Sequence, residues 1–122
     1  MAHKKILIID DDHGLLKVLQ VNLASHGFTV FTAETGEDGL ELIKKNPPDL
    51  VLLDVILPGI KGREVCKCIK EDPKTKNIPV VFLTAKDSPD DITAELKLGA
   101  IAHLTKPIDF QRLLSELRKI LD

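Results

Sequence analysis

Polar side chains suited to phosphoryl chemistry follow four short apolar runs of this sequence. They are a cluster of acids, a single acid, a hydroxyl and an ammonium, in the order Asp10-Asp11-Asp12, Asp54, Thr84 and Lys106. Carboxylates can hold a divalent cation or act as nucleophiles, while a hydroxyl and an ammonium can bind phosphoryl oxygens. If the runs are parallel buried strands, their carboxyl ends share one edge of a sheet, and these groups meet there.

The acids after the first and third runs would repel one another at close range. A divalent cation removes that repulsion, and Mg²⁺ prefers hard oxygen ligands while it keeps several of its waters. Asp10, Asp11 and Asp54 are therefore the candidate ligands of a magnesium site. We interpret Asp12 instead as the cap of the helix that follows, because aspartate is common at helix starts.

Asp54 follows directly on an apolar run, which makes it the carboxylate best placed to act as a nucleophile. Its attack on a phosphoryl group would give an acyl phosphate, with a bound cation neutralising the charge of the arriving group. The Lys106 ammonium can pair with the phosphoryl oxygens, and the Thr84 hydroxyl can hydrogen-bond one of them. The predicted chemistry is phosphoryl transfer to an aspartate.

Short strands and amphipathic helices must position these residues. Residues 6–9, 50–53, 80–83 and 101–104 are apolar at both alternate sets of positions, which indicates strands buried on both faces. Residues 28–32 are more mixed, which favours an edge strand. Helices are predicted to end near Gly27 and to span 36–45, 62–71, 89–98 after a cap at Ser88, and a last segment from 110 after a cap at Asp109.

The alternation of strands and helices predicts a doubly wound α/β fold with a parallel sheet and right-handed crossovers. In such a fold the ligand site lies at the carboxyl ends of the strands, where the winding direction reverses. The chain has 122 residues, of which 43% are hydrophobic, so we expect one domain over residues 1–122.

Composition argues against several function classes. The net charge is −2 and no long basic run is present, so direct nucleic-acid binding is not expected. No apolar stretch approaches the roughly 20 residues that span a bilayer, and the start lacks a signal-peptide layout, so we expect a cytoplasmic protein without membrane contact. Cys66 and Cys68 have no partners for a zinc site and are interpreted as reduced thiols. The basic pairs Lys44-Lys45, Lys61-Arg63 and Lys67-Lys70 are interpreted as solvated faces.

Taken in order, Asp10-Asp11, Asp54, Thr84-Ala85 and Lys106-Pro107 resemble the motifs of response regulator receiver domains. The segment from Asp54 to Gly59, with Gly62, also resembles the phosphoacceptor loop of that family. The resemblance covers essentially the whole chain. It implies a flavodoxin-like, three-layer fold with five parallel strands in the order 2-1-3-4-5.

The resemblance also implies roles for individual residues. Asp54 would be the phosphoacceptor, Asp11 a direct magnesium ligand, Asp10 a ligand through water, and the Ile56 carbonyl a main-chain ligand. The groups that would bind the phosphoryl oxygens are the side chains of Thr84 and Lys106 and the backbone amides of Val55, Ile56 and Ala85. A cis Lys106-Pro107 bond would aim the lysine inward. Such a cis bond is energetically tolerable only before proline.

In the mechanism implied by the resemblance, Asp54 takes its phosphoryl group from a sensor histidine kinase or a phosphotransfer protein. Thr84 then moves toward the phosphate, and the fourth helix, fifth strand and fifth helix repack to meet a downstream protein or an output domain. A second copy of the chain is a further candidate partner. The chain would not be an enzyme, although it would catalyse its own phosphorylation and dephosphorylation.

Two positions depart from the family pattern. His103 stands where the family usually has Tyr or Phe, whose ring swings inward as the threonine moves. We interpret His103 as a packed or half-exposed strand residue rather than a pH sensor, and as the candidate switch residue with Thr84. Ile56 is apolar where the family often has a polar or sulfur-containing residue near the path of hydrolytic water, so we expect a long-lived phosphoryl group.

Two alternative functions stay open. A phosphatase of the haloacid dehalogenase type also uses an aspartyl phosphate and magnesium, but Gly14 stands where its first motif needs Thr or Val. A receiver-like binding module that acts without phosphorylation is the other alternative. No output-domain pattern follows the last predicted helix, so we expect the chain to act alone or to be part of a longer regulator.

Overall fold

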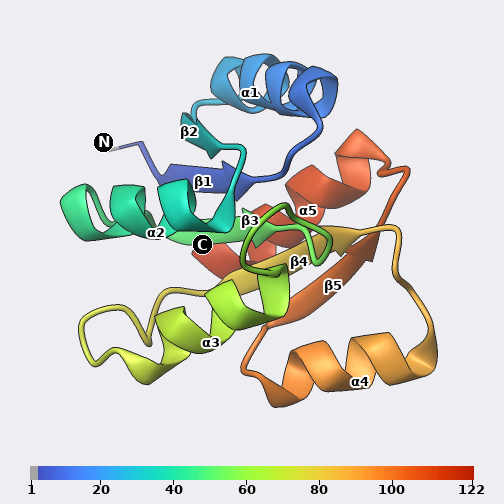
Figure 1. Ribbon diagram of the computed structural model, residues 1–122. Coiled ribbons are helices and arrows are strands. Elements are labelled where there is room, and N and C mark those ends of the chain that lie inside the picture. The colour runs from blue at the N-terminus through green and yellow to red at the C-terminus, as the bar shows by residue number, and fades with distance from the viewer. Residues whose placement is uncertain (1–2) are drawn as a thin grey trace.

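The structure, a computed structural model, describes residues 3–122 as a sheet with helices on both faces (Figure 1). The strands are β1 (Lys5–Ile9), β2 (Thr29–Ala33), β3 (Leu50–Leu53), β4 (Val80–Thr84) and β5 (Ala102–Thr105). The helices are α1 (His13–Ser25), α2 (Gly36–Lys45), α3 (Gly62–Glu71), α4 (Pro89–Lys97) and α5 (Phe110–Leu121). None of the helices within residues 3–122 combines the length and the apolar character that a membrane crossing requires.

The strands pair in parallel in the order β2-β1-β3-β4-β5, which confirms the predicted doubly wound fold. β1 pairs with both β2 and β3, so the winding direction reverses at β1. Ile9 of β1 lies opposite Leu53 of β3. The Asp54 N–H then donates to the Ile9 carbonyl at 3.0 Å, so Asp10 and Asp54 leave the sheet side by side at one edge.

The core consists of two layers, one on each face of the sheet. Alternate residues of β1 point into different layers. Ile6 and Ile8 pack with α1 and α5, while Leu7 and Ile9 pack with α2 and α3. Figure 1 shows these helices on opposite sides of the strands. Because helices cover both faces, the central strands carry apolar residues at every position, which is the pattern seen in the sequence.

Side chains cap four of the five helices. The residues Asp12, Thr35, Ser88 and Asp109 each accept a backbone N–H from the first turn of the helix that follows. Such a bond satisfies one of the N–H groups that a helix start leaves without a partner. The sequence predictions for Asp12, Ser88 and Asp109 are confirmed, whereas Lys61 caps α3 without a side-chain hydrogen bond.

β2 and β5 each begin one residue later than the sequence predicted. The bounds of a strand depend on hydrogen bonds to its neighbour, and Thr29 pairs with Lys5 while Ala102 pairs with Val81. Ile101 precedes the ladder and its side chain is exposed, although its N–H donates to the Val80 carbonyl at 2.8 Å. Apolar character alone therefore misplaced the start of β5.

Lys70 is not part of a solvated face, and that interpretation was wrong. Its ammonium donates to the carbonyls of Lys76 at 3.0 Å and Ile78 at 2.6 Å, in the connection between α3 and β4. Burial lowers the pKa of the Lys70 ammonium. The side chain is half-buried, and it supplies donors to two carbonyls that lie outside the strands and helices.

Candidate functional site

Three carboxylates meet at the carboxyl edge of the sheet. Asp10 follows β1 and Asp54 follows β3, and both are buried, while Asp11 is exposed. Oxygen atoms of the three side chains all lie within 4.8 Å of one another. Carboxylate oxygens at this spacing are suitable ligands for a hard divalent cation such as Mg²⁺.

Lys106 bridges two of these acids. Its Nζ lies 2.7 Å from Asp10 Oδ2 and 2.8 Å from Asp54 Oδ2. Burial by itself lowers the pKa of the Lys106 ammonium, but the hydrogen bonds and charges of the two aspartates outweigh it, so the pKa lies above its ordinary value. The Lys106-Pro107 bond is cis, as the resemblance implied, and the Lys106 N–H donates to the Thr84 carbonyl at 2.9 Å.

Asp10 is held in a site that disfavours its charge. Burial raises the pKa of its carboxyl group, the charge of Asp54 adds to this, and hydrogen bonds from Lys106 and the Asp12 N–H only partly oppose it. The Asp12 N–H donates to Asp10 Oδ1 at 2.9 Å. A second positive charge beside Lys106 would relieve the remaining cost, so the residues present fit a divalent cation.

The two oxygens of Asp54 face different surroundings. Oδ2 accepts from Lys106, while Oδ1 accepts from the Ile56 N–H at 3.2 Å. The loop after Asp54 packs tightly onto the start of α3, since the Gly62 N–H donates to the Val55 carbonyl at 2.9 Å. A Cβ atom on Gly62 would lie 1.9 Å from the Asp54 carbonyl oxygen, so glycine is required there.

Thr84 and Ala85 stand at the neighbouring strand end. Thr84 is fully buried at the end of β4, and its hydroxyl oxygen accepts from the Lys86 N–H at 3.3 Å. Ala85 is exposed. The structure therefore brings Asp10, Asp11, Asp54 and Lys106 into one cluster at the edge where β4 also ends.

A family model described as the response regulator receiver domain matches residues 6–118. The chain belongs to this family. The transcriptional regulatory protein AfsQ1 of Streptomyces coelicolor is 39% identical over 116 residues, which are 95% of this chain. This chain spans only 50% of the length of AfsQ1.

Solved receiver structures share the fold closely. The BeF3-activated N-terminal receiver domain of RstA from Klebsiella pneumoniae is 32% identical, with a TM-score of 0.90 over 96% of this chain and 97% of that one. The chemotaxis protein CheY4 of Vibrio cholerae is 29% identical, with a TM-score of 0.93 over 98% of this chain and 100% of that one. This chain is thus a receiver domain of two-component signalling.

One residue of this receiver domain escaped the sequence analysis. Glu95 of α4 is fully buried, and its Oε1 lies 2.5 Å from Nδ1 of His103 on β5. His103 is packed as expected, and its Nε2 lies 3.2 Å from the Thr105 hydroxyl. The burial of Glu95 could have been predicted from its place in an apolar stripe, because it lies three residues from both Ile92 and Leu98.

Proposed function

We propose that this receiver domain accepts a phosphoryl group on Asp54 in a Mg²⁺-dependent reaction. The observation that carries the proposal is the bridging position of the Lys106 ammonium, bound to Asp10 and Asp54 at 2.7 and 2.8 Å. A cation that pairs with the acceptor carboxylate is also placed to pair with the oxygens of an arriving phosphoryl group. Asp10, Asp11 and Asp54 would hold the magnesium ion, which would neutralise charge on that group.

The residues around Asp54 would each contribute to transfer. Asp54 attacks the phosphorus atom through a carboxylate oxygen, and the bond from phosphorus to the donor atom breaks. Lys106 turns its ammonium toward a phosphoryl oxygen, and the Thr84 hydroxyl and the amides of Ile56 and Ala85 donate to the others. The Ile56 amide already faces Asp54, since it donates to Oδ1.

An apolar groove beside Lys106 supports a protein as the phosphoryl donor. The groove has a volume of about 490 Å³ and lies between α1 and the connection from β5 to α5. Its apolar lining comes from Leu15, Val18, Leu19, Ala85, Pro107, Ile108 and Phe110. A helix of a sensor histidine kinase or phosphotransfer protein that docks in this groove would present its phosphohistidine beside Lys106.

The partner that receives the signal would contact the face of α4, β5 and α5. Phosphorylation would shift an equilibrium between two arrangements of this face only as far as its contacts differ between them. AfsQ1 is named a transcriptional regulatory protein and is about twice as long as this chain. We therefore include an output domain in the same polypeptide, a separate downstream protein and a second copy of the chain as partners.

Intact mass measurement tests the proposal. After incubation with Mg²⁺ and acetyl phosphate, we expect the mass to rise by one phosphoryl group in the wild type and not in Asp54→Asn. Chelation of Mg²⁺ should prevent the addition. Rapid release of inorganic phosphate without a stable adduct would instead indicate a phosphatase, and absence of any reaction would indicate a binding module that acts unphosphorylated.

A further inference from the structure

The loop between β3 and α3 has a flexible joint at Gly59. Leu57 is buried, and the proline that follows it restricts the backbone of both residues, so Leu57 and Pro58 form a stiff link. Gly59 has a φ of 71°, a conformation that residues with a side chain rarely adopt. The Ile56 carbonyl, which the family resemblance implies as a main-chain ligand of Mg²⁺, precedes this link. A stiff link transmits movement at Gly59 to that carbonyl.

Glu37 of α2 contacts this joint from outside the loop. Its Oε2 accepts from the Ile60 N–H at 3.3 Å. Both carboxylate oxygens lie close to Gly59, because a Cβ atom on Gly59 would be 2.6 and 2.9 Å from them. Figure 1 shows the first turn of α2 beside the loop. Within residues 3–122, the bond from Ile60 to Glu37 is the one hydrogen bond that joins residues 55–61 to any part of the chain outside residues 54–71.

The start of α2 is itself packed against the loop. The Thr35 side chain caps the helix. A Cβ atom on Gly36 would lie 2.7 Å from Cγ1 of Ile60 and 2.6 Å from Cγ2 of Val65, so the backbone of α2 is in close contact with the loop and with α3. Glu37 is the next residue of the helix. Its backbone is therefore fixed beside the loop that its carboxylate contacts.

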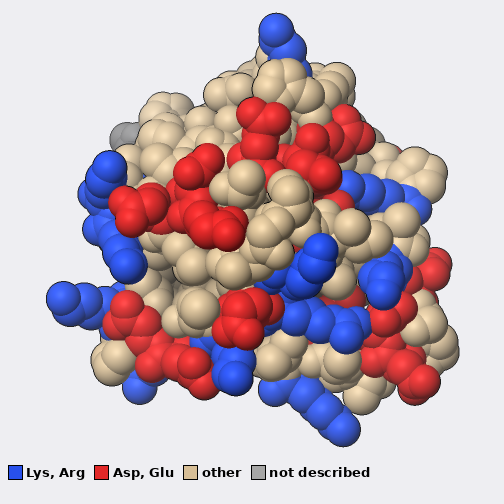
Figure 2. Space-filling model, viewed as in Figure 1, with Lys and Arg blue, Asp and Glu red and all other residues tan. Residues whose placement is uncertain are grey.

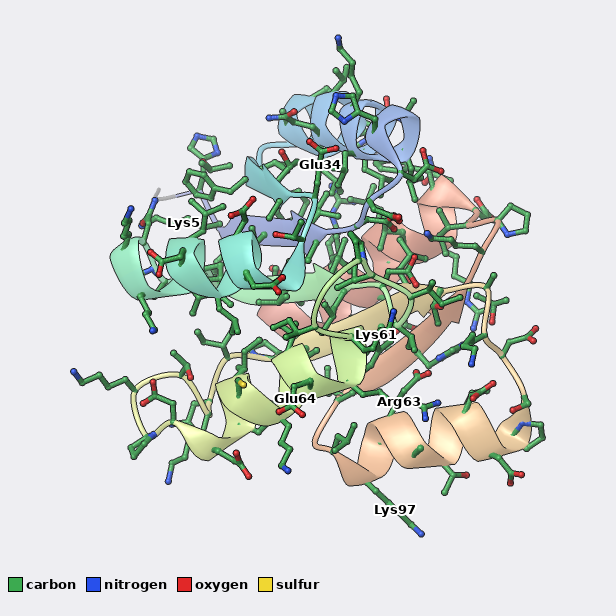
Figure 3. All side chains as sticks on the ribbon, in the orientation of Figure 1. Lys5, Glu34, Lys61, Arg63, Glu64 and Lys97 are labelled. Carbon is green, nitrogen blue, oxygen red and sulfur yellow. The ribbon has the colours of Figure 1, made fainter. Side chains whose placement is uncertain are left out.

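The other side-chain tether of this loop is internal. The Lys61 ammonium donates to the Leu57 carbonyl at 3.0 Å, and Figure 3 shows Lys61 on the loop itself. Such a bond keeps the loop compact but moves with it. The contact with Glu37 differs, because it refers the position of the loop to a helix on another part of the fold.

We propose that Glu37 is a positioning residue of the Mg²⁺ site, which holds Gly59 and Ile60 so that the Ile56 carbonyl can bind the ion. This inference rests on the proposed function, in which Mg²⁺ binds beside Asp54. Contacts that hold metal ligands in place affect the affinity even though they do not touch the ion. Without the acceptor on Glu37 the joint is freer, and ion binding then has to order it.

The charge of Glu37 is a different route to the same effect. Figure 2 shows Asp and Glu side chains gathered on the part of this face where α2 begins. A negative charge attracts Mg²⁺ over a Debye length, which is about 8 Å at physiological salt. Glu37→Gln removes the charge but keeps an oxygen that accepts from an N–H. Glu41→Ala removes an equal charge from the next turn of α2, where the side chain is exposed and, within residues 3–122, forms no ion pair.

The dissociation constant for Mg²⁺ tests the inference without phosphorylation, and NMR titration of the backbone amide signals measures it. Glu37→Ala should weaken Mg²⁺ binding by about threefold to tenfold, the effect of losing one hydrogen bond of ordinary strength. Glu37→Gln and Glu41→Ala should each change the dissociation constant by less than about twofold, as expected for one exposed charge. Urea unfolding without Mg²⁺ establishes that each variant is folded under the conditions of the titration.

The remaining outcomes count against the inference. If Glu37→Ala binds Mg²⁺ as tightly as the wild type, Glu37 does not position the site. If Glu37→Gln or Glu41→Ala weakens binding as much as Glu37→Ala does, negative charge rather than the contact with the loop is responsible. In either case a wild type that still accepts a phosphoryl group in Mg²⁺ leaves the proposed function intact. A wild type that does not bind Mg²⁺ overturns both.

Discussion

The Nδ1 atom of His103 lies 2.5 Å from Oε1 of Glu95, and this contact joins β5 to α4 inside the protein. The two side chains are only 5% and 0% exposed. The second oxygen of Glu95 is buried and has no hydrogen-bond partner within the described residues, so His103 is the hydrogen-bond partner on which the Glu95 carboxyl group depends. A phenylalanine ring at this position would have no donor to offer.

His103→Phe should therefore destabilise this receiver domain strongly. The substitution leaves a buried carboxylate without a partner, which costs about 3–5 kcal/mol. We expect this loss in the free energy of unfolding, measured by urea denaturation at neutral pH. The double variant His103→Phe/Glu95→Leu removes both polar groups and should be more stable than His103→Phe alone. Losses that simply add across the two sites would show that the pair does not interact.

Magnesium should stabilise the folded protein. A ligand that binds only the folded state at one hundred times its dissociation constant adds about 2.7 kcal/mol to the free energy of unfolding. We expect a gain of this order on addition of Mg²⁺, its loss on chelation, and a much smaller gain in Asp11→Asn. Thermal unfolding with and without Mg²⁺ measures it. An equal gain in Asp11→Asn would place the cation elsewhere.

Asp10→Asn should change the stability in the opposite direction, because this variant should be more stable than the wild type when Mg²⁺ is absent. The pKa of Asp10 is raised in the folded state, so the folded protein binds this proton more tightly than the unfolded chain does. Stability is thus lost as pH rises through the carboxyl titration, and the ionised group is unfavourable at neutral pH. Without Mg²⁺, Asp10→Asn should unfold at a higher urea concentration than the wild type. With Mg²⁺ that advantage should shrink.

Gly62→Ala should disturb the phosphoacceptor loop. Its Cβ would lie 1.9 Å from the Asp54 carbonyl oxygen and 2.8 Å from the Val55 Cα, and both are backbone atoms that cannot turn aside. We expect a loss of about 1–3 kcal/mol in stability, as for other overpacked sites, and slower phosphorylation of Asp54. Gly14→Ala is the matched control, because its Cβ would meet Asp12 Oδ1 at an ordinary 3.6 Å. Similar losses in both variants would contradict the steric explanation.

Cys66 should make the stability fall in alkaline solution. Burial, with a smaller effect from the charge of Glu95, raises the pKa of the Cys66 thiol from 9.0 to about 11. The unfolded chain releases this proton first, so the contribution to stability is present below pH 9 and is lost as pH rises toward about 11. The loss approaches about 2–3 kcal/mol.

Urea unfolding of Cys66→Ala near both ends of this pH range isolates the effect. The variant should be less stable throughout, because it loses buried volume, but its stability should depend less on pH than that of the wild type. Cys68→Ser serves as the control, since Cys68 is a free thiol that is only half-buried. An unchanged pH dependence in Cys66→Ala would assign the effect to other groups.

Ile56→Asn should hasten loss of the phosphoryl group. The Ile56 side chain is 52% exposed, and its N–H donates to Oδ1 of Asp54, so the residue borders the approach to the acceptor. An amide can orient a hydrolytic water where an aliphatic side chain hinders it. A decay assay on the purified phosphorylated protein should show a rate several-fold higher than in the wild type. An equal or slower rate would exclude this role.

The parallel, doubly wound sheet and the polar residues at its strand ends could be predicted because they depend on local patterns, whereas the strand order was implied by the family resemblance. Apolar runs that are buried on both faces, and caps such as Asp12 and Asp109, leave clear traces in the sequence. In a parallel sheet the strand ends share one edge, and because β1 pairs directly with β3, Asp10 and Asp54 lie close together. The sequence by itself therefore determined the fold class and the acids of the candidate site.

The tertiary structure decided which polar residues are buried and what they contact. Glu95 lies on a helix that is exposed on its other side, and only the packing of α4 against β5 turns its carboxylate toward His103. Lys70 was misjudged for the same reason, because its acceptors belong to a connection whose path no periodicity predicts. Periodicity reports which face of an element is apolar, whereas the charge balance of a buried pair depends on contacts between elements distant in sequence.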